Sequence, residues 1–248
     1  MLKALSRLFT RRKEYPQADL GSLCADMHSH LIPGIDDGAK TIEDSMRLIR
    51  GLCDAGYQKI ITTPHIMSDY YRNTPEIILG GLEQVRNAIR EEGLQVSIEA
   101  AAEYYIDDGF MRKLDEERLM TFGDQYLLVE VSYINPPDSI HAVLFKAQTL
   151  GYRPVLAHPE RYPYWYHDIE QYRMFYEKGV TLQLNINSLS GYYGPEAKRI
   201  AEKLIELDLV GAIGTDMHHD RHLEALQHAR RSPALHALLE RPLLNREL

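Results

Sequence analysis

Cysteine is scarce in this 248-residue chain, which contains Cys24 and Cys53 and no others. Two thiols cannot form a disulfide framework, and neither lies in a CxxC or a similar zinc-binding spacing. We therefore expect a reducing, cytoplasmic compartment, in which both side chains act as small apolar residues.

Long apolar runs and basic surfaces are also missing from the body of the chain. No segment approaches the roughly 18 consecutive apolar residues of a transmembrane helix. The formal net charge is -8, and no basic stripe suited to nucleic-acid binding is present. No Ser-, Pro- or Gly-rich linker divides the sequence, and a chain of this length buries about 70–75% of its unfolded surface. We therefore expect one domain.

Residues 1–22 differ from this body and form a predicted N-terminal leader, followed by a barrel domain at 23–248. Apolar and basic residues alternate there at helical spacing: Leu2, Leu5, Leu8 and Phe9 among Lys3, Arg7, Arg11, Arg12 and Lys13. The leader lacks the apolar centre and cleavage site of a signal peptide. A basic amphipathic helix can lie on an anionic membrane surface. A frayed leader and a helix packed on the domain are the alternatives.

Short apolar runs and helical patterns alternate about seven times along the body. The runs, read as buried strands, are 23–26, 57–64, 94–101, 125–129, 152–157, 180–184 and 209–215. Start and stop signals predict helices at 41–56, 74–93, 138–151 and 194–208. This alternation is typical of an α/β fold with a parallel sheet.

One polar residue follows each predicted strand at the carboxyl end. Successive members are separated by 27 to 38 residues: His28, His65, Glu103, Glu130, His158, Asn185 and Asp216. A β/α unit needs roughly 30 residues, so the polar positions recur once per unit. In a β/α barrel the carboxyl ends of the strands carry the active site. Taken singly, His65 would be a core or loop histidine and Glu103 or Glu130 an ordinary strand-end acid.

Several of these positions gain a neighbour two residues away, on the same face of an extended chain. His30 accompanies His28, and His218 accompanies Asp216. The predicted metal ligands are five imidazoles and four carboxylates: His28, His30, Asp37, His65, Glu103, Glu130, His158, Asp216 and His218. So many donors suit two or three ions. Because no thiolate is among them, manganese, iron and zinc remain open.

Adjacent divalent cations favour phosphate-ester hydrolysis, because they lower the pKa of a shared water and neutralise phosphoryl oxygens. Arg161 and Arg221 lie near predicted ligands and could bind phosphate with a planar guanidinium; surface ion pairs are the alternative. Tyr162, Tyr164 or Trp165 could line a pocket for an aromatic substrate, although core packing also explains this aromatic cluster.

The segments HSH, DDG, TPH, AEYY, LVEVS, AHPERY and TDMH occur in this order between about residues 24 and 225. Together they resemble the polymerase and histidinol phosphatase (PHP) superfamily. The greatest similarity is to the manganese-dependent bacterial protein tyrosine phosphatases of capsule and exopolysaccharide operons.

The resemblance implies a distorted, TIM-like barrel of seven β/α units with a trinuclear centre. By motif, His28, His30, Glu103 and Asp216 hold one ion, and Glu103 bridges to a second ion bound by Glu130 and His158. Asp37, His65 and His218 hold the third, and the preference for Asp37 over Asp36 comes from the family pattern. Arg161 and Arg221 match phosphate-contacting arginines, Arg161 through HPER and Arg221 through a loop that departs from the pattern. Mn²⁺ is the first candidate ion.

The implied activity is hydrolysis of phosphotyrosine in a protein, in this family a membrane-attached tyrosine kinase that controls polysaccharide export. A small-molecule phosphatase of the same superfamily, acting on histidinol phosphate or a sugar or nucleotide phosphate, is one alternative. A non-catalytic, metal-stabilised scaffold is another. No Cys-x5-Arg loop surrounds either cysteine, so a thiol mechanism has no residues on which to run.

Overall fold

The computed structural model describes residues 15–116, 118–137 and 139–248. Most of the predicted leader, and with it the predicted amphipathic helix, lies outside these ranges. Ala18 and Leu20, on the leader side of the expected boundary at residue 22, are buried in the core of the body.

The strands are short and parallel, and they occupy seven positions of a ring within the described residues. Two of these positions are strands interrupted near their middle, and Pro64 lies in one of the interruptions, where its missing N–H cannot join the ladder. The first sheet contains β1 (Ala25–Asp26), β2 (Lys59–Thr62) and β4 (Ser97–Ala100). The second contains β3 (His65–Ile66), β5 (Glu103–Tyr105), β6 (Tyr126–Glu130), β7 (Arg153–Ala157), β8 (Thr181–Asn185) and β9 (Ala212–Gly214).

The first and last strands meet just beyond their carboxyl ends. An isolated parallel bridge pairs Ser29 with Met217, and the Asp216 N–H donates to the His28 carbonyl at 2.8 Å. The ring is therefore joined by a short contact rather than by a continuous ladder. The predicted distorted barrel of seven β/α units is confirmed.

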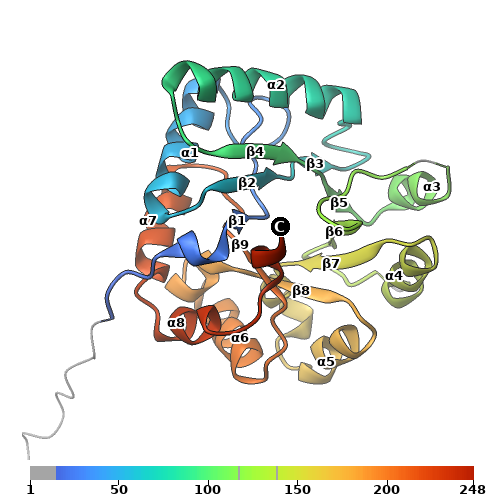
Figure 1. Ribbon diagram of the computed structural model, residues 1–248. Coiled ribbons are helices and arrows are strands. Elements are labelled where there is room, and N and C mark those ends of the chain that lie inside the picture. The colour runs from blue at the N-terminus through green and yellow to red at the C-terminus, as the bar shows by residue number, and fades with distance from the viewer. Residues whose placement is uncertain (1–14, 117, 138) are drawn as a thin grey trace, which may run out of the picture.

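Helices surround the ring on its outside (Figure 1). They are α1 (Ile42–Ala55), α2 (Pro75–Glu92), α3 (Asp108–Glu116), α4 (Ile140–Thr149), α5 (Ile169–Glu177), α6 (Pro195–Glu206), α7 (Asp220–Ala229) and α8 (Pro233–Leu239). Short 3₁₀ turns are η1 (Leu20–Leu23), η2 (Pro159–Arg161), η3 (Pro163–Trp165), η4 (Ile186–Ser190) and η5 (Leu244–Glu247). Among the described residues, no helix is both long and apolar enough to cross a membrane.

The predicted helix signals act as expected in α1. The Thr41 hydroxyl accepts from the Asp44 N–H in a capping box, and Gly56 ends the helix with a φ of 113°. Gly56 disfavours any side chain, because a Cβ would lie 2.5 Å from the backbone nitrogen of Gly21 and the positive φ would be strained. These signals fix where the chain leaves each helix for the next strand.

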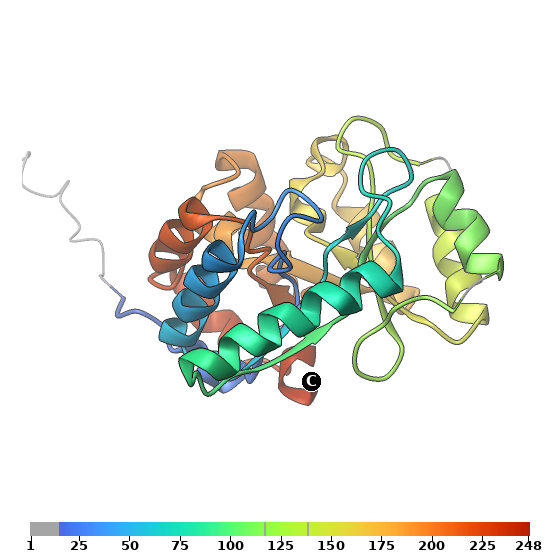
Figure 2. The ribbon, with the colours of Figure 1, turned by 90° about the horizontal axis from the view of Figure 1, so that it is seen from above.

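The barrel has two different ends, which Figure 2 shows on opposite sides of the molecule. Loops that follow the strands gather at one end, here called the mouth. At the other end η5 closes the ring, and the buried Asn245 side chain bonds the backbone of β1 and β9. Side chains such as Leu128, Val155 and Ala212 fill the space between the two ends.

Candidate metal centre

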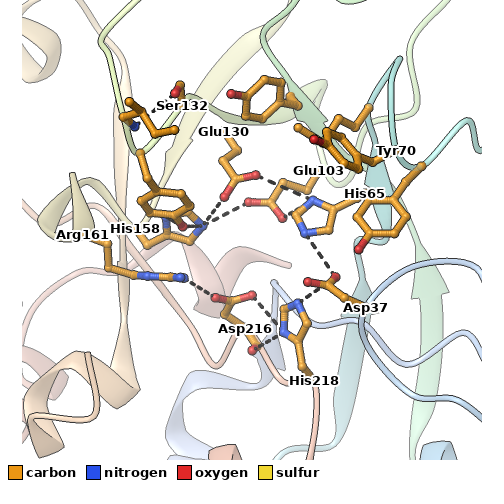
Figure 3. Close-up of a pocket in the computed structure, with 15 residues that line it drawn as sticks. Asp37, His65, Tyr70, Glu103, Glu130, Ser132, His158, Arg161, Asp216 and His218 are labelled. Atoms are coloured by element: carbon orange, nitrogen blue, oxygen red, sulfur yellow. Dashed lines mark hydrogen bonds and ion pairs between the residues drawn. The ribbon is translucent and has the colours of Figure 1, made fainter. Parts of the chain in front are cut away.

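The mouth contains a cavity of about 470 Å³. Its floor is made of imidazoles and carboxylates from strand ends that are distant in the sequence, and Figure 3 shows His65, Glu103, His158 and Asp216 directed toward one another. Parallel strands end at the same edge, which explains why residues spaced by one β/α unit meet here.

All nine predicted ligands are brought together. They form four overlapping groups, in each of which the donor atoms lie within 4.8 Å of one another. The groups are His30, Asp37, His65 and His218; His28, His30 and Glu103; His28, His158 and Asp216; and His65, Glu103 and Glu130.

His28 and His30 are oriented by partners behind them. The Nδ1 atom of His28 lies 2.9 Å from Oε1 of Gln183, and that of His30 lies 2.8 Å from Oδ2 of Asp36. Both partner oxygens are acceptors, so Nδ1 carries a proton in each ring, and in the neutral ring the Nε2 lone pair is available to a metal ion. The two Nε2 atoms nevertheless face each other at 3.3 Å.

Carboxylate oxygens lie at the same point. Glu103 Oε2 is 3.2 Å from His28 Nε2 and 3.4 Å from His30 Nε2, and Asp216 Oδ1 is 3.3 Å and 3.4 Å from the same two atoms. When both imidazoles are neutral, four acceptors converge here without a donor, and they repel one another in a buried site unless protons or a metal ion lie between them. The arrangement therefore fits a metal ion.

Glu103 is the most central of these groups. Its Oε2 atom and the Nδ1 atom of His65 are 3.1 Å apart, yet both are buried without a hydrogen-bond partner among the described residues. Buried polar atoms are rarely left unsatisfied, so this pair also points to a ligand.

The excess of negative charge in the floor raises the pKa values of two of its side chains, His28 and Glu130. Burial lowers the pKa of His28, but the charges of Glu103 and Asp216 outweigh burial and raise that pKa to about 9. Burial together with the charge of Glu103 raises the pKa of Glu130 well above its usual value. A cation would stabilise the ionised form of Glu130 and displace protons from the imidazoles.

His158 is already suited to coordinate. Burial and the neighbouring Arg161 lower its pKa to about 4, which leaves the imidazole neutral at physiological pH. Its Nε2 lies 3.2 Å from Glu103 and 3.6 Å from Glu130. His158 and Asp216 also adopt positive φ values of 33° and 50°, and such strained backbone tends to occur at functional sites.

Arg161 borders the floor, whereas Arg221 does not. One Nη atom of Arg161 donates to Asp216 Oδ2 at 2.6 Å, and its guanidinium lies 4.0 Å from the ring centre of Tyr193 and 5.0 Å from that of Tyr133. Arg221 is exposed on α7 and lines a separate surface hollow. The predicted phosphate role of Arg221 has no support from this arrangement.

The aromatic cluster after HPER packs away from the cavity. Tyr162 and Trp165 are buried in the core, and the Tyr164 hydroxyl donates to the Ser132 carbonyl at 2.6 Å. None of the three lines the cavity, so core packing is the correct explanation for them. The aromatic walls are instead Tyr70, Tyr71, Tyr105 and Tyr133.

Three supporting residues were absent from the predicted site. Asp36 orients His30 and also accepts from the His65 N–H at 3.1 Å, while the amides of Gln183 and Asn185 bond His28 and Asp216. Asn185 is one of the polar residues that follow the predicted strands, so the sequence gives a signal for it. Asp36 gives none of its own, because the family pattern favours the adjacent Asp37. Gln183 lies inside a strand pattern that gives no sign of a polar role.

Comparison with known proteins identifies the family of this chain. The family model described as capsular polysaccharide synthesis, CpsB/CapC, matches residues 24–237. The tyrosine-protein phosphatase YwqE of Bacillus subtilis (strain 168) is 28% identical over 195 residues, which cover 78% of this chain and 77% of that protein. The tyrosine-protein phosphatase CpsB of Streptococcus pneumoniae is 30% identical over 200 residues, which cover 78% and 82%.

A solved structure is similar over most of both chains. It aligns with a TM-score of 0.78 at 27% identity and covers 87% of this chain and 86% of its own. It comes from a description of YwqE from Bacillus subtilis and CpsB from Streptococcus pneumoniae as unique metal-dependent tyrosine phosphatases. The predicted resemblance is thereby confirmed, and this chain belongs to the CpsB/CapC family of capsular polysaccharide synthesis.

Proposed function

We propose that this protein is a metal-dependent tyrosine-protein phosphatase. The observation that carries the proposal is the convergence of His28, His30, Glu103 and Asp216, whose imidazole Nε2 atoms and carboxylate oxygens meet at one buried point. The names of the family's relatives supply the substrate class.

The nine donors divide among up to three divalent ions, with Mn²⁺ as the first candidate and iron and zinc as alternatives. By the family resemblance, His28, His30, Glu103 and Asp216 would hold one, and Glu130 and His158 would hold a second together with Glu103. Asp37 completes the third with His65 and His218, which lie 3.5 Å and 3.4 Å from its Oδ1 atom. Bound ions supply a water of lowered pKa and neutralise phosphoryl charge.

Arg161 binds the non-bridging oxygens of the phosphoryl group. The hydrogen bond to Asp216 and the two tyrosine rings fix its guanidinium beside the floor. A fixed guanidinium binds phosphate through parallel N–H donors. The tyrosine leaving group has a pKa near ~10, so it departs with less help from an acid than an alkyl alcohol needs.

The protein substrate is a phosphotyrosine protein of capsule or exopolysaccharide synthesis, and a membrane-attached bacterial tyrosine kinase is the first candidate. This choice rests on the family description. The scarcity of cysteine agrees with action in the cytoplasm. The basic leader at 1–22 would bring the barrel domain at 23–248 to the membrane surface on which such a kinase lies.

The test compares three substrates on protein loaded with manganese: a phosphotyrosine peptide, a phosphoserine peptide and histidinol phosphate. We expect preferential turnover of the phosphotyrosine peptide, abolished by chelator and restored by manganese. Equal turnover of all three substrates would overturn the tyrosine assignment, and preference for histidinol phosphate would favour the small-molecule alternative. The His158→Ala variant should remain folded and inactive, and turnover by no loaded sample would favour the scaffold.

A further inference from the structure

Two loops at the mouth of the barrel each place large side chains beside the candidate metal centre. One loop joins β3 to α2 and the other joins β6 to α4. Tyr71, in the first loop, stacks on His65 with ring centres 5.5 Å apart, and Tyr133, in the second, stacks on His158 at 5.9 Å. His65 and His158 lie on opposite sides of the floor in Figure 3. The two tyrosine rings therefore form facing walls above the donors.

Each of these tyrosines has a neighbour in the sequence that lies at the tip of its loop. These two neighbours are the most exposed large apolar side chains among the described residues. Tyr70 is 76% exposed and Ile134 is 82% exposed, and both line the cavity. Exposed apolar side chains gathered at one cavity commonly mark a binding surface. Together with Tyr71, Tyr105 and Tyr133 they form what we call the collar.

Hydrogen bonds hold both tips in place. Met67 and Tyr71 exchange backbone bonds of 2.9 Å and 3.0 Å across the turn that carries Tyr70. The Ser132 hydroxyl accepts from the Ile134 N–H at 3.1 Å, and the Ser132 carbonyl accepts from Tyr164. A side chain presented on a fixed turn loses little conformational entropy on binding.

The position of the collar above the donors fits one class of phosphate ester. A phosphotyrosine side chain places a phenyl ring between its phosphate and the peptide backbone, whereas phosphoserine has a single methylene there. With the phosphate on the floor, the phenyl ring lies between the facing walls and the backbone stays at the level of Tyr70 and Ile134. The backbone of a phosphoserine peptide would have to descend into the collar.

We infer that the collar is the subsite for the phosphotyrosine ring and its flanking residues, and that Tyr70 and Ile134 select aryl over alkyl phosphate esters. This inference rests on the proposed function. It assigns the floor to the phosphoryl chemistry and the collar to the choice of substrate, so the two can be separated by mutation.

The experiment uses the full chain loaded with manganese and the Tyr70→Ala/Ile134→Ala double variant. The matched control is Phe145→Ala/Tyr176→Ala. It also removes two large exposed side chains, which are 65% and 47% exposed and do not line the cavity. The substrates are phosphotyrosine and phosphoserine peptides of the same sequence, and inorganic phosphate serves as a competitive inhibitor.

We expect the double variant to raise KM for the phosphotyrosine peptide by about tenfold, with a much smaller change in kcat, because contacts outside the reacting group are lost. Its preference for phosphotyrosine over phosphoserine should fall by a similar factor. The inhibition constant of phosphate and the metal content should match the control, because phosphate reaches only the floor.

Unchanged kinetics with the phosphotyrosine peptide would overturn the collar while leaving the proposed function intact. Loss of bound metal or of phosphate inhibition in the double variant would also overturn it, since Tyr70 and Ile134 would then shape the floor. A wild-type protein that does not turn over phosphotyrosine would refute the proposed function itself, and the collar with it.

Discussion

The two ends of the barrel bury polar side chains in opposite ways. At the closed end, the Asn245 amide donates to the carbonyls of Ala25 and Ile213 at 3.0 Å and 2.7 Å and accepts from the Ile213 N–H at 2.9 Å. At the mouth, His28 Nε2, His30 Nε2 and Glu103 Oε2 converge, and all three are acceptors when the imidazoles are neutral.

This difference separates a structural polar group from a binding group. Every donor at Asn245 meets an acceptor, so the closed end is complete within the chain. The mouth has an excess of lone pairs and negative charge, which protons on the imidazoles or bound metal ions must compensate. Burial of polar residues alone would not distinguish the two ends, whereas the identity of their partners does.

The largest effect is expected for Glu103→Gln, which retains the shape but removes the central charge. Activity should fall to background and bound manganese should decrease, because the ions lose a shared ligand. The fold should persist, since Gln keeps the volume of Glu and the neighbouring imidazoles can become neutral when the charge is removed. Elemental analysis, circular dichroism and phosphotyrosine turnover check this, and a variant with full activity would refute the shared-ligand role.

Asn245→Leu tests the closed end. It should lower the free energy of unfolding by about 3 kcal/mol, because three buried backbone groups lose their partner. Urea denaturation measures this change. Manganese content and kcat should equal those of the wild type under native conditions, and selective loss of metal without loss of stability would show that the two ends are not independent.

Glu160 sharpens the comparison, because its Oε2 atom is buried without a partner among the described residues but lies in no donor group. Burial raises its pKa from 4.5 to about 7, against the opposing hydrogen bond from Ser188. The folded state therefore favours the neutral acid. Its stabilisation is complete below pH 4.5 and is lost as pH rises to about 7.

Glu160→Gln should remove that loss, which amounts to about 3 kcal/mol. Unfolding free energies of the metal-loaded protein at several pH values measure the effect. A flatter profile with unchanged metal content is expected. An unchanged slope would assign the pH dependence to other groups, and lost metal would place Glu160 among the ligands.

Asp36→Asn should give the smallest effect. The amide oxygen still accepts from His30, but the charge that strengthens this ligand is lost, and manganese affinity should fall by about tenfold. Asp69→Asn, at an exposed acid of the β3–α2 loop, is the matched control. Titration with manganese, followed by recovered activity, measures both variants. Equal affinities would remove Asp36 from the supporting set.

The sequence predicted those parts of the site whose residues recur at a regular spacing along the chain. His65, Glu103, Glu130 and His158 recur once per β/α unit, and because parallel strands end at one edge, this spacing was sufficient to bring them together. Thr41 and Gly56 likewise predicted the bounds of α1 from local chemistry alone.

The rest depended on loop conformation, which has no period. The sequence allows Tyr162 and Trp165 to line a pocket, but the two 3₁₀ turns after β7 direct their rings into the core. Tyr70 and Ile134 gave no signal, because exposure at a loop tip depends on tertiary hydrogen bonds. Asp36 and Asp37 are adjacent acids, and only their partners distinguish the supporting residue from the donor.

Anomalous X-ray scattering at the manganese edge, from crystals of the manganese-loaded protein, tests the central claim most directly. The account predicts a peak within coordination distance of His28, His30, Glu103 and Asp216, with further peaks at the donor groups that share Glu103 and His65. Manganese bound elsewhere, or no peak at these donors after loading, would contradict it.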